Sequence, residues 1–399
     1  MHSGGAAPVV LATVPYYFPG FCGGGKPIAL RNLIAALRGE CSFMVLTANH
    51  DLGDPTPYGA VQSNRWMRGE GCAIFYLGAS ATMLPRMRAT LSGGNYDILY
   101  LNTVFSRPFG ILPLILHRFG AIPGKPLVIA PRGELAPGAL AIKSRRKRGF
   151  LAAARALRLF DDATWQASGE TEARDIRVAV GGEARISIAA DVPAPDYRSR
   201  RPSAYRKTPG RLDIMFLSRI TPIKNLHLAI EALRGLEGEI TFRIVGPIDD
   251  ARYWERCRKQ IATLDSHIRI DYLGPIPDSE VSNYLRHHGL LFLPTAGESF
   301  GFVILEALLA GCPVLISDRT PWRDLTGAGI GWDLPLVRAD LMQAALRQCV
   351  AMDADAHRTM SLRAREFALA YLAREDSAAR HLAMFRAAAG HEPARRLSA

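Results

Sequence analysis

The chain of 399 residues is too long for one ordinary hydrophobic core, so two domains are expected. Its 48% hydrophobic and 22% charged residues are typical of a globular protein, and no apolar run reaches the roughly 18 to 20 residues of a membrane helix. The net charge of +12 indicates an anionic partner, such as nucleic acid, a phosphorylated small molecule or a membrane surface.

Cysteine and histidine spacing argues against disulfides and against a metal centre. The six cysteines are scattered without a CxxC pair, and the ten histidines lack a ligand spacing such as HxxxH. The opening MHSGGAAPVVLATV has neither a basic n-region nor a cleavage pattern, so no signal peptide is expected. These features predict a cytoplasmic protein with reduced thiols.

Strand-like runs alternate with helical patterns through the first half of the chain. This alternation is the βαβ rhythm of a doubly wound α/β sheet. The runs expected to be strands lie at 9–14, 42–47, 72–77, 97–102, 126–131, 163–168 and 186–190.

A glycine-rich loop follows the first predicted strand. Gly23, Gly24 and Gly25 stand between that strand and a helix-like stretch at 26–39. Glycine lets the backbone approach a ligand closely, and the start of a helix offers free amide groups. The loop can therefore hold a phosphate group, or it can be only a turn.

The densest positive charge is the run KSRRKR, which precedes a stretch of helical apolar spacing. Basic residues at a helix start oppose the helix dipole, which favours a functional reason for them. The run is either a solvated helix start or a patch that faces anionic lipid or a phosphorylated acceptor. Its basic residues are Lys143, Arg145, Arg146, Lys147 and Arg148.

The composition changes near the middle of the chain. Residues 193–210 are rich in proline and arginine and lack apolar periodicity, which is typical of an interdomain linker. The βαβ rhythm then restarts, and the pattern is helical from about Asp340 onward. We predict one Rossmann-like domain at 1–195, a linker at 196–210 and a second such domain at 211–371. The strands expected in the second half lie at 211–218, 239–246, 267–274, 290–294 and 312–317.

Two cations follow the first strand of the second half. Arg219 stands at the strand end, and Lys224 stands at the start of a helix that Thr221 and Pro222 mark. Ligands of open α/β sheets bind beyond the carboxyl ends of the strands. Two cations and a helix N-terminus there predict an anion site, and a diphosphate fits it well. The alternative is a surface arginine and lysine with no shared role.

A carboxylate, Glu306, stands among apolar residues in the stretch PTAGESFGFVILEALLAGCPVL at 294–315. Burying a charge without a partner costs roughly several kcal/mol or more. We expect a ligand to compensate that cost, since a buried carboxylate can accept hydrogen bonds from two ribose hydroxyls. Seven residues separate Glu306 from Glu298, which could hold hydroxyls of a second sugar, and Ser299 is the expected N-cap.

Several segments together resemble a known enzyme family. The segments SRITPIKNL, GPI, DYLGPIPDSEVSNYL and PTAGESFGFVILEALLAGCPVL, in this order, resemble the donor half of retaining glycosyltransferases of family 4. TPWRDLTGAGIGWDLPL and APRGELAPGAL are similar to a subgroup that includes many exopolysaccharide and lipopolysaccharide sugar transferases. The resemblance implies the GT-B fold, in which two Rossmann-like domains face each other across a cleft. It also implies that a helix at about 372–390 packs back on the first domain.

The resemblance implies a role for individual residues. Arg219 and Lys224 would hold the donor diphosphate and stabilise charge as it leaves. Glu306 would bind the ribose, and Glu298 would orient the transferred sugar with help from backbone groups of nearby residues. The loop around Ile276 would contact the base. The remaining donor-binding positions are Gly24, Gly25, Gly246, Ser299, Phe300 and Gly301.

One position departs from the family pattern. Many relatives have a histidine that helps the transfer where the motif PRG places Arg132. Arg132 could bind the donor phosphates, bind an acidic acceptor, or be structural, and the sequence leaves these interpretations open.

The resemblance implies metal-independent transfer of a hexose, with retention, from a UDP- or GDP-sugar to a glycan or polyprenyl-linked glycan in cell-surface polysaccharide synthesis. No cofactor is expected, because the cations and a helix dipole take the place of a metal. Peripheral contact with the inner face of the membrane would involve residues 143–148. The alternative is a nucleotide-sugar-binding protein with impaired catalysis. A nucleic-acid partner is not expected, since no recognised module accompanies the charge.

Overall fold

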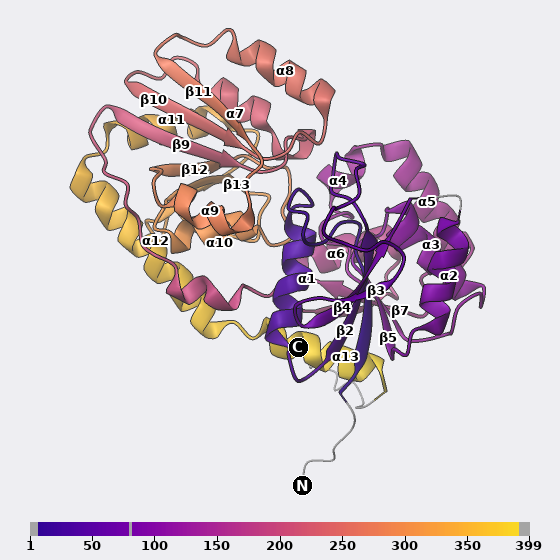
Figure 1. The fold of residues 1–399 in the computed structure, drawn as a ribbon. Helices are drawn as coiled ribbons and strands as arrows, with labels where there is room; N and C mark the ends of the chain where they lie inside the picture. Colours follow the sequence, from indigo (N-terminus) through magenta and orange to yellow (C-terminus); the bar gives the residue numbers. More distant parts are fainter. Residues whose placement is uncertain (1–6, 80–81, 391–399) are drawn as a thin grey trace. The chain divides into compact units, whose positions relative to one another are not determined.

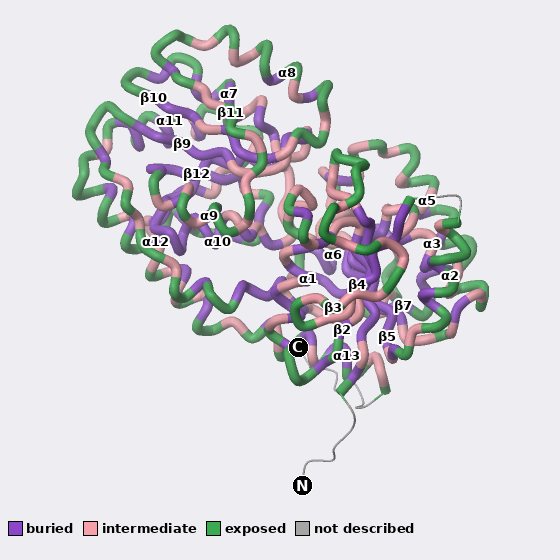
Figure 2. The backbone as a smooth tube through the Cα atoms, viewed as in Figure 1, coloured by how far each residue is buried: buried purple, intermediate pink, exposed green. Residues whose placement is uncertain are grey.

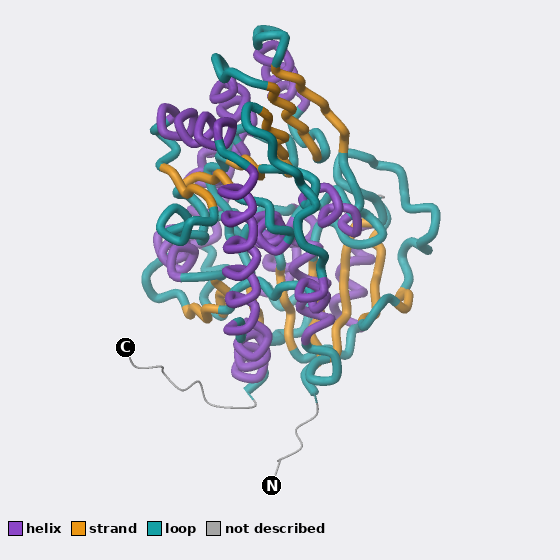
Figure 3. The backbone as a smooth tube through the Cα atoms, turned by 90° about the vertical axis from the view of Figure 1, so that its left-hand side faces the viewer, coloured by secondary structure: helices purple, strands orange, loops and turns teal. Residues whose placement is uncertain are grey.

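The computed structural model describes residues 7–79 and 82–390. The chain divides into two compact units, one comprising Met1–Ala194 with Asp376–Ala399 and the other Pro195–Glu375 (Figure 1). Each unit is built around its own parallel sheet. In Figure 3, where strands are orange and helices purple, the alternation of the two along the chain can be followed.

The first unit contains an eight-stranded sheet in the order β3-β4-β2-β1-β5-β6-β7-β8. All seven predicted strands of this half are present. The short edge strand β3 was not predicted, and it is the only antiparallel member of the sheet among the described residues. Its sequence, WMR, is not an apolar run, and none of its three residues is buried. The strands are Val9–Thr13 (β1), Ser42–Ala48 (β2), Trp66–Arg68 (β3), Cys72–Leu77 (β4), Ile98–Leu101 (β5), Leu127–Ile129 (β6), Ala163–Ala167 (β7) and Arg185–Ile188 (β8).

Apolar side chains cover both faces of this sheet, which is why its strands are apolar runs rather than alternating ones. Along β1, Leu11 belongs to one hydrophobic cluster, while Val10 and Ala12 belong to another. Figure 2 shows the strands as largely buried and the helices as partly exposed. The helices are Gly25–Ala36 (α1), Met83–Gly93 (α2), Leu112–Arg118 (α3), Pro137–Ala141 (α4), Ser144–Ala156 (α5) and Glu170–Val180 (α6), and Arg107–Ile111 forms a π-helical turn.

The helix Ser377–Ala388 (α13) belongs to the first unit although it lies near the end of the chain. Its fully buried Phe385 contacts Phe43 and Tyr100 edge to face, with ring centroids 6.1 and 5.3 Å apart. The aromatic contacts fill the cluster on one face of the sheet. The chain thus enters the second unit after Ala194 and returns to the first at Asp376.

The second unit contains a six-stranded parallel sheet in the order β11-β10-β9-β12-β13-β14. The five predicted strands are present, and the additional edge strand β14 was not predicted. Gly331 begins β14 at a φ of 155°, where an added Cβ would lie 2.2 Å from the carbonyl oxygen of Val314, so glycine is required there. The strands are Arg211–Leu217 (β9), Glu239–Val245 (β10), Ile268–Gly274 (β11), Leu290–Leu293 (β12), Val314–Ser317 (β13) and Gly331–Leu334 (β14).

Six helices of the described chain accompany this second sheet. The first four alternate with the strands, as the βαβ pattern predicts, and the last two follow β14. They are Leu226–Leu233 (α7), Ala251–Ile261 (α8), Asp278–Leu285 (α9), Phe302–Leu309 (α10), Ala339–Ala351 (α11) and Ala354–Arg374 (α12).

The segment 196–210, expected to be a linker, instead packs within the second unit. Pro195–Ser199 forms a 3₁₀ turn whose Tyr197 side chain is buried. The buried Lys207 ammonium donates hydrogen bonds to the carbonyl oxygens of Thr208, Arg211 and Val350. Proline and arginine content indicated an interdomain linker, but polar groups of this segment have partners in the second unit.

The order of the strands reverses direction at one point in each sheet. In the first unit the chain moves outward from β1 to β2 and then restarts on the other side at β5, while in the second unit β9 and β12 are the corresponding neighbours. In open α/β sheets, ligands bind outside the carboxyl ends of the strands at such a switch point. The two switch points therefore identify where a site is expected in each unit.

We predict that Phe385→Ala lowers the free energy of unfolding by about 3 to 5 kcal/mol, because it leaves a cavity against Phe43 and Tyr100. Chemical denaturation followed by near-ultraviolet circular dichroism measures the change. Arg386→Ala on the same helix is the control, since it removes only an exposed ion pair with Glu40. Equal losses of stability in the two variants would contradict the packing of α13 described here.

Candidate functional site

The switch point of the second unit brings together two of the predicted catalytic residues. Lys224 ends the 3₁₀ turn Pro222–Lys224 after β9, and Glu298 lies in the loop after β12. Their side chains form an ion pair in which each is 14% exposed. Water therefore screens this pair only in part, so its electrostatic attraction is stronger than that of a surface pair.

Backbone hydrogen bonds fix the two loops to each other. The Ala296 amide donates to the Ile223 carbonyl at 2.7 Å, and the Asn225 side-chain amide donates to the Pro294 carbonyl at 2.9 Å. The Glu298 amide donates to the Arg319 carbonyl at 3.1 Å. These bonds hold the Lys224–Glu298 pair in one place, so the charged groups are pre-organised.

Arg219 lies two residues beyond the end of β9, near the strand end as predicted, and its ion-pair partner is not the one that Lys224 has. Its guanidinium donates to a carboxylate oxygen of Asp249 at 2.6 Å, and the two side chains are 35% and 28% exposed. Both predicted cations thus lie in the loop after β9, and each pairs with a different carboxylate. An incoming diphosphate would have to share these cations with Asp249 and Glu298 or displace the two carboxylates.

The buried carboxylate of Glu306 has partners within the protein, which corrects the expectation that a ligand compensates its burial. Its side chain is 4% exposed and accepts hydrogen bonds from the Tyr197 hydroxyl at 2.9 Å and from the Arg200 guanidinium at 3.0 Å. Both donors come from the segment read as a linker, more than a hundred residues earlier, so no local pattern could reveal them. Burial is therefore no reason to place a ribose at Glu306, and that role stays a prediction.

Burial raises the pKa of Glu306 to about 7, although Arg200 and the Tyr197 hydroxyl act in the opposite direction. Desolvation disfavours the charged form, and one cation does not fully offset it. The carboxyl of Glu306 therefore changes its protonation state near neutral pH.

Local geometry explains several other predicted donor-binding positions. Gly246 has a φ of 139°, and an added Cβ would lie 2.0 Å from the Ser218 carbonyl oxygen, so the close approach of β10 to the end of β9 requires glycine. Gly301 is the N-cap of α10, with a φ of 81°, and Ser299 is not that N-cap, which corrects the prediction.

The Phe300 carbonyl accepts a hydrogen bond from the Trp322 indole at 2.6 Å. Ile276 lies half-buried in the loop before α9.

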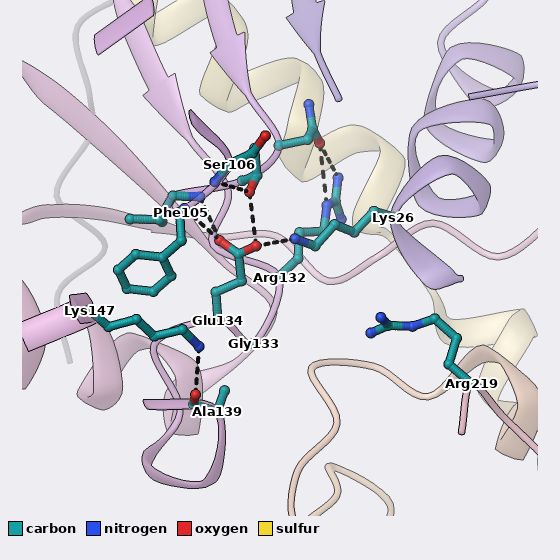
Figure 4. Close-up of polar contacts among 12 residues, drawn as sticks. Lys26, Phe105, Ser106, Arg132, Gly133, Glu134, Ala139, Lys147 and Arg219 are labelled. Atoms are coloured by element: carbon teal, nitrogen blue, oxygen red, sulfur yellow. Dashed lines mark hydrogen bonds and ion pairs between the residues drawn. The ribbon is translucent and has the colours of Figure 1, made fainter. Parts of the chain in front are cut away.

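The switch point of the first unit contains a second lysine–glutamate pair that the sequence interpretation missed. Gly24 and Gly25 stand at the start of α1, and the next residue, Lys26, forms an ion pair with Glu134 (Figure 4). Lys26 directly follows the glycine run and Glu134 directly follows PRG, so attention to strand ends would have found both.

Glu134 is held by hydrogen bonds from the loop after β5. Its carboxylate accepts from the Thr103 hydroxyl at 2.9 Å and from the backbone amides of Val104 at 2.6 Å and Phe105 at 3.2 Å. Burial alone would raise the pKa of Glu134, but Lys26 and these donors outweigh it and the pKa is lowered. Glu134 is therefore a carboxylate at neutral pH, with Lys26 as its cation.

The contacts of Arg132 support the structural interpretation among the three left open. Its guanidinium forms an ion pair with Asp191, and both side chains are 4% exposed. It also donates to the Tyr100 hydroxyl and to the Asn102 side-chain oxygen, each at 2.9 Å. These partners all belong to the first unit, so the guanidinium is committed to the interior of that unit.

The basic run divides into exposed and inward-facing residues. Lys143, Arg145, Arg146 and Arg148 are exposed at the start of α5. Lys147 is not part of that patch, because its ammonium donates to the Ala139 carbonyl at 2.6 Å and lies 5.0 Å from the centre of the Phe105 ring. Helical geometry separates them, since Lys147 lies on the face of α5 that turns toward the unit.

Residues 7–79 and 82–390 show neither a metal-ligand cluster nor a membrane-spanning helix. They contain no cluster of three or more histidine, cysteine, aspartate or glutamate side chains suited to a metal ion. None of their helices combines the length and hydropathy needed to cross a membrane.

Comparison with known proteins confirms the resemblance over the second unit. Residues 199–366 match the family model of glycosyl transferases group 1. A phosphatidyl-myo-inositol mannosyltransferase of Mycobacterium leprae is 33% identical over 34% of this chain and 38% of its own length. A putative colanic acid biosynthesis glycosyltransferase, WcaL of Salmonella typhimurium, is 32% identical over 40% of this chain and 41% of its own length. The chain thus matches about two fifths of these relatives.

Solved structures extend the likeness to nearly the whole chain and confirm the GT-B fold. Sucrose-phosphate synthase from Thermosynechococcus elongatus superimposes with a TM-score of 0.76 at 17% identity, covering 96% of this chain and all of that one. HepE from Anabaena, in complex with UDP and glucose, gives a TM-score of 0.68 at 18% identity, covering 94% of this chain and 98% of that one. At this identity the likeness shows the fold.

We predict that Glu306 makes stability depend on pH. Its pKa rises from 4.5 to about 7 on folding, so its contribution is full below about pH 4.5 and is lost as the pH rises through 7. The unfolding free energy of the wild type, relative to Glu306→Gln, should fall by about 2 to 3 kcal/mol between pH 5 and 8. Urea denaturation at each pH measures it.

A second variant makes this test specific. Tyr197→Phe removes a hydrogen bond that lowers the pKa of Glu306, so the pKa should rise further. The unfolding free energy relative to Glu306→Gln should then fall more steeply with pH than in the wild type. Parallel pH curves for the wild type and Glu306→Gln would show that the buried carboxyl does not titrate in this range.

Proposed function

We propose that this chain is a glycosyltransferase that uses a UDP- or GDP-linked hexose as donor. The observation that carries the proposal is the Lys224–Glu298 pair at the β9/β12 switch point, within the segment that matches glycosyl transferases group 1. That HepE, which shares the fold, forms a complex with UDP and glucose supports a nucleotide-sugar donor. A diphosphate between two strand ends is the ligand that this position accommodates best.

In this proposal, Lys224 and Arg219 bind the donor diphosphate and Glu298 orients hydroxyls of the sugar. The bond between the anomeric carbon and the diphosphate oxygen breaks, and its electron pair leaves with the diphosphate. The acceptor oxygen bonds to the anomeric carbon on the same face, and its proton passes to the departing phosphate oxygen. The two cations stabilise the developing charge, which is usually the largest contribution to such a step, so no metal is needed.

We further propose that the acceptor is a glycan or a polyprenyl-linked glycan of a cell-surface polysaccharide. The name of the relative WcaL, which refers to colanic acid biosynthesis, supports this class. The exposed Lys143, Arg145, Arg146 and Arg148 would place the enzyme peripherally on the anionic inner face of the membrane.

A second candidate is a nucleotide-sugar-binding protein with impaired catalysis. The commitment of Arg132 to Asp191 favours it, because the position that often carries a helpful histidine is then occupied by a structural residue. This candidate would bind the donor without turnover.

We expect Lys224→Ala to lower the rate of nucleotide release from the active donor by about 10² to 10³, because it removes a cation from the leaving group. A panel of UDP- and GDP-sugars with coupled detection of free UDP or GDP measures the rate. Lys259→Ala, an exposed lysine on α8, is the matched control and should retain the wild-type rate. A Lys224→Ala variant as active as the wild type would refute the site, and wild-type binding without release would favour the second candidate.

The membrane proposal has its own test. Binding to vesicles that contain phosphatidylglycerol should weaken as salt rises, and reversal of Arg145, Arg146 and Arg148 to glutamate should weaken it at least tenfold, since each basic residue contributes about 1 kcal/mol. Reversal of Arg252, Arg256 and Lys259, which are exposed on α8, makes the same change of charge elsewhere. Equal effects of the two triple variants would exclude a specific patch at α5.

A further inference from the structure

Two lysines lie beside Glu134 at the switch point of the first unit, and a third, Lys143, is close to one of them. Lys26 comes from α1 and is paired with Glu134, and Lys147 comes from α5 (Figure 4). Lys143, the residue before α5, is close enough for its charge to act on the Lys147 ammonium, as are those of Lys26 and Glu134. Lys26 and Lys147 therefore approach Glu134 near the carboxyl ends of β1, β5 and β6, and the buried Glu172, which accepts a hydrogen bond from the Gly133 amide, is a second carboxylate at this loop.

The carboxylate does not neutralise this group of lysines. Glu134 already accepts hydrogen bonds from the Thr103 hydroxyl and from two backbone amides in addition to its ion pair with Lys26. These donors occupy its lone pairs, so the function of Glu134 is to orient Lys26 and order the loop after β5. Neither Lys143 nor Lys147 forms an ion pair with Glu134 among the described residues, although the charge of Glu134 acts favourably on the Lys147 ammonium.

The position of Lys147 points to a missing anion. An ammonium has three donors, and among the described residues Lys147 uses one of them on the Ala139 carbonyl, at 2.6 Å. The Phe105 ring lies on another side, 5.0 Å from the ammonium. Burial lowers the pKa of Lys147, Glu134 is the largest charge that acts against this lowering, and the charges of Lys26 and Lys143 add to it. A bound anion would relieve this like-charge repulsion.

We propose that Lys26, Lys143 and Lys147 form a binding site for a phosphate or diphosphate group carried by the sugar acceptor. This inference rests on the proposed transferase function and narrows its acceptor to a phosphorylated molecule. Lysine ammoniums act as point charges and suit a multiply charged oxyanion, while recognition of a single carboxylate favours the fork of an arginine. The arginine nearest in sequence to Glu134, Arg132, is committed to Asp191.

The test is calorimetric titration of inorganic pyrophosphate into the full chain with Lys224→Ala as background, so that the candidate donor site contributes little. Lys147→Gln and Lys143→Gln are compared with Lys259→Gln, the same substitution at an exposed lysine of the second unit. Because Lys143 is exposed, Lys143→Gln should leave the fold intact. It therefore measures the loss of pyrophosphate affinity even if Lys147→Gln lowers the thermal unfolding midpoint. We expect pyrophosphate to bind, each cluster variant to weaken it at least tenfold, and the control to stay within twofold.

Absence of pyrophosphate binding, or equal affinity in all variants, would overturn the site. A parallel arm uses vesicles of phosphatidylcholine and phosphatidylglycerol to separate an acceptor phosphate from lipid headgroups. Vesicle binding that depends on Lys147 and is not displaced by pyrophosphate would also overturn it. Failure of the proposed function is recognised separately, because pyrophosphate would still bind to the lysines while no nucleotide sugar is turned over.

Discussion

The candidate site depends on the ion pair between Lys224 and Glu298, because this pair joins the two loops that diverge at the β9/β12 switch point. Partial burial makes the pair stronger than a surface ion pair, but it also means that both charges have lost much of their hydration. An anion that takes over Lys224 frees Glu298 to accept hydrogen bonds from sugar hydroxyls. Without donor, the ion pair would thus hold both side chains in place. With donor bound, Lys224 would bind the diphosphate and Glu298 would bind the sugar.

The first unit also has a lysine–glutamate pair at its switch point, but there the carboxylate accepts more hydrogen bonds. Lys26 and Glu134 also lie at a switch point, but Glu134 has three additional donors. Among the described residues, Lys224 is the one side chain that donates to the Glu298 carboxylate. More bonds to the carboxylate make the first pair a support for its loop rather than an exchangeable contact. Charges in the first unit are therefore suited to hold a phosphate beside the pair, and those in the second to bind one through it.

The sequence was sufficient to predict features that adjacent residues encode. Apolar runs predicted twelve strands, and strand ends located Arg219, Lys224 and Glu298, because a period-2 or buried strand and the loop after it are encoded by adjacent residues. It failed where partners are distant. Tyr197 and Arg200 satisfy Glu306, and Asp191 satisfies Arg132, and no spacing rule connects these residues. The edge strands β3 and β14 were missed because neither WMR nor GWDL is a run of apolar residues.

The most direct measurement is a crystal structure of the protein with UDP bound. Our account predicts that the diphosphate oxygens lie within hydrogen-bond distance of Lys224 and Arg219, with Glu298 released from its lysine. A diphosphate bound away from both cations, with the Lys224–Glu298 pair intact, would contradict it.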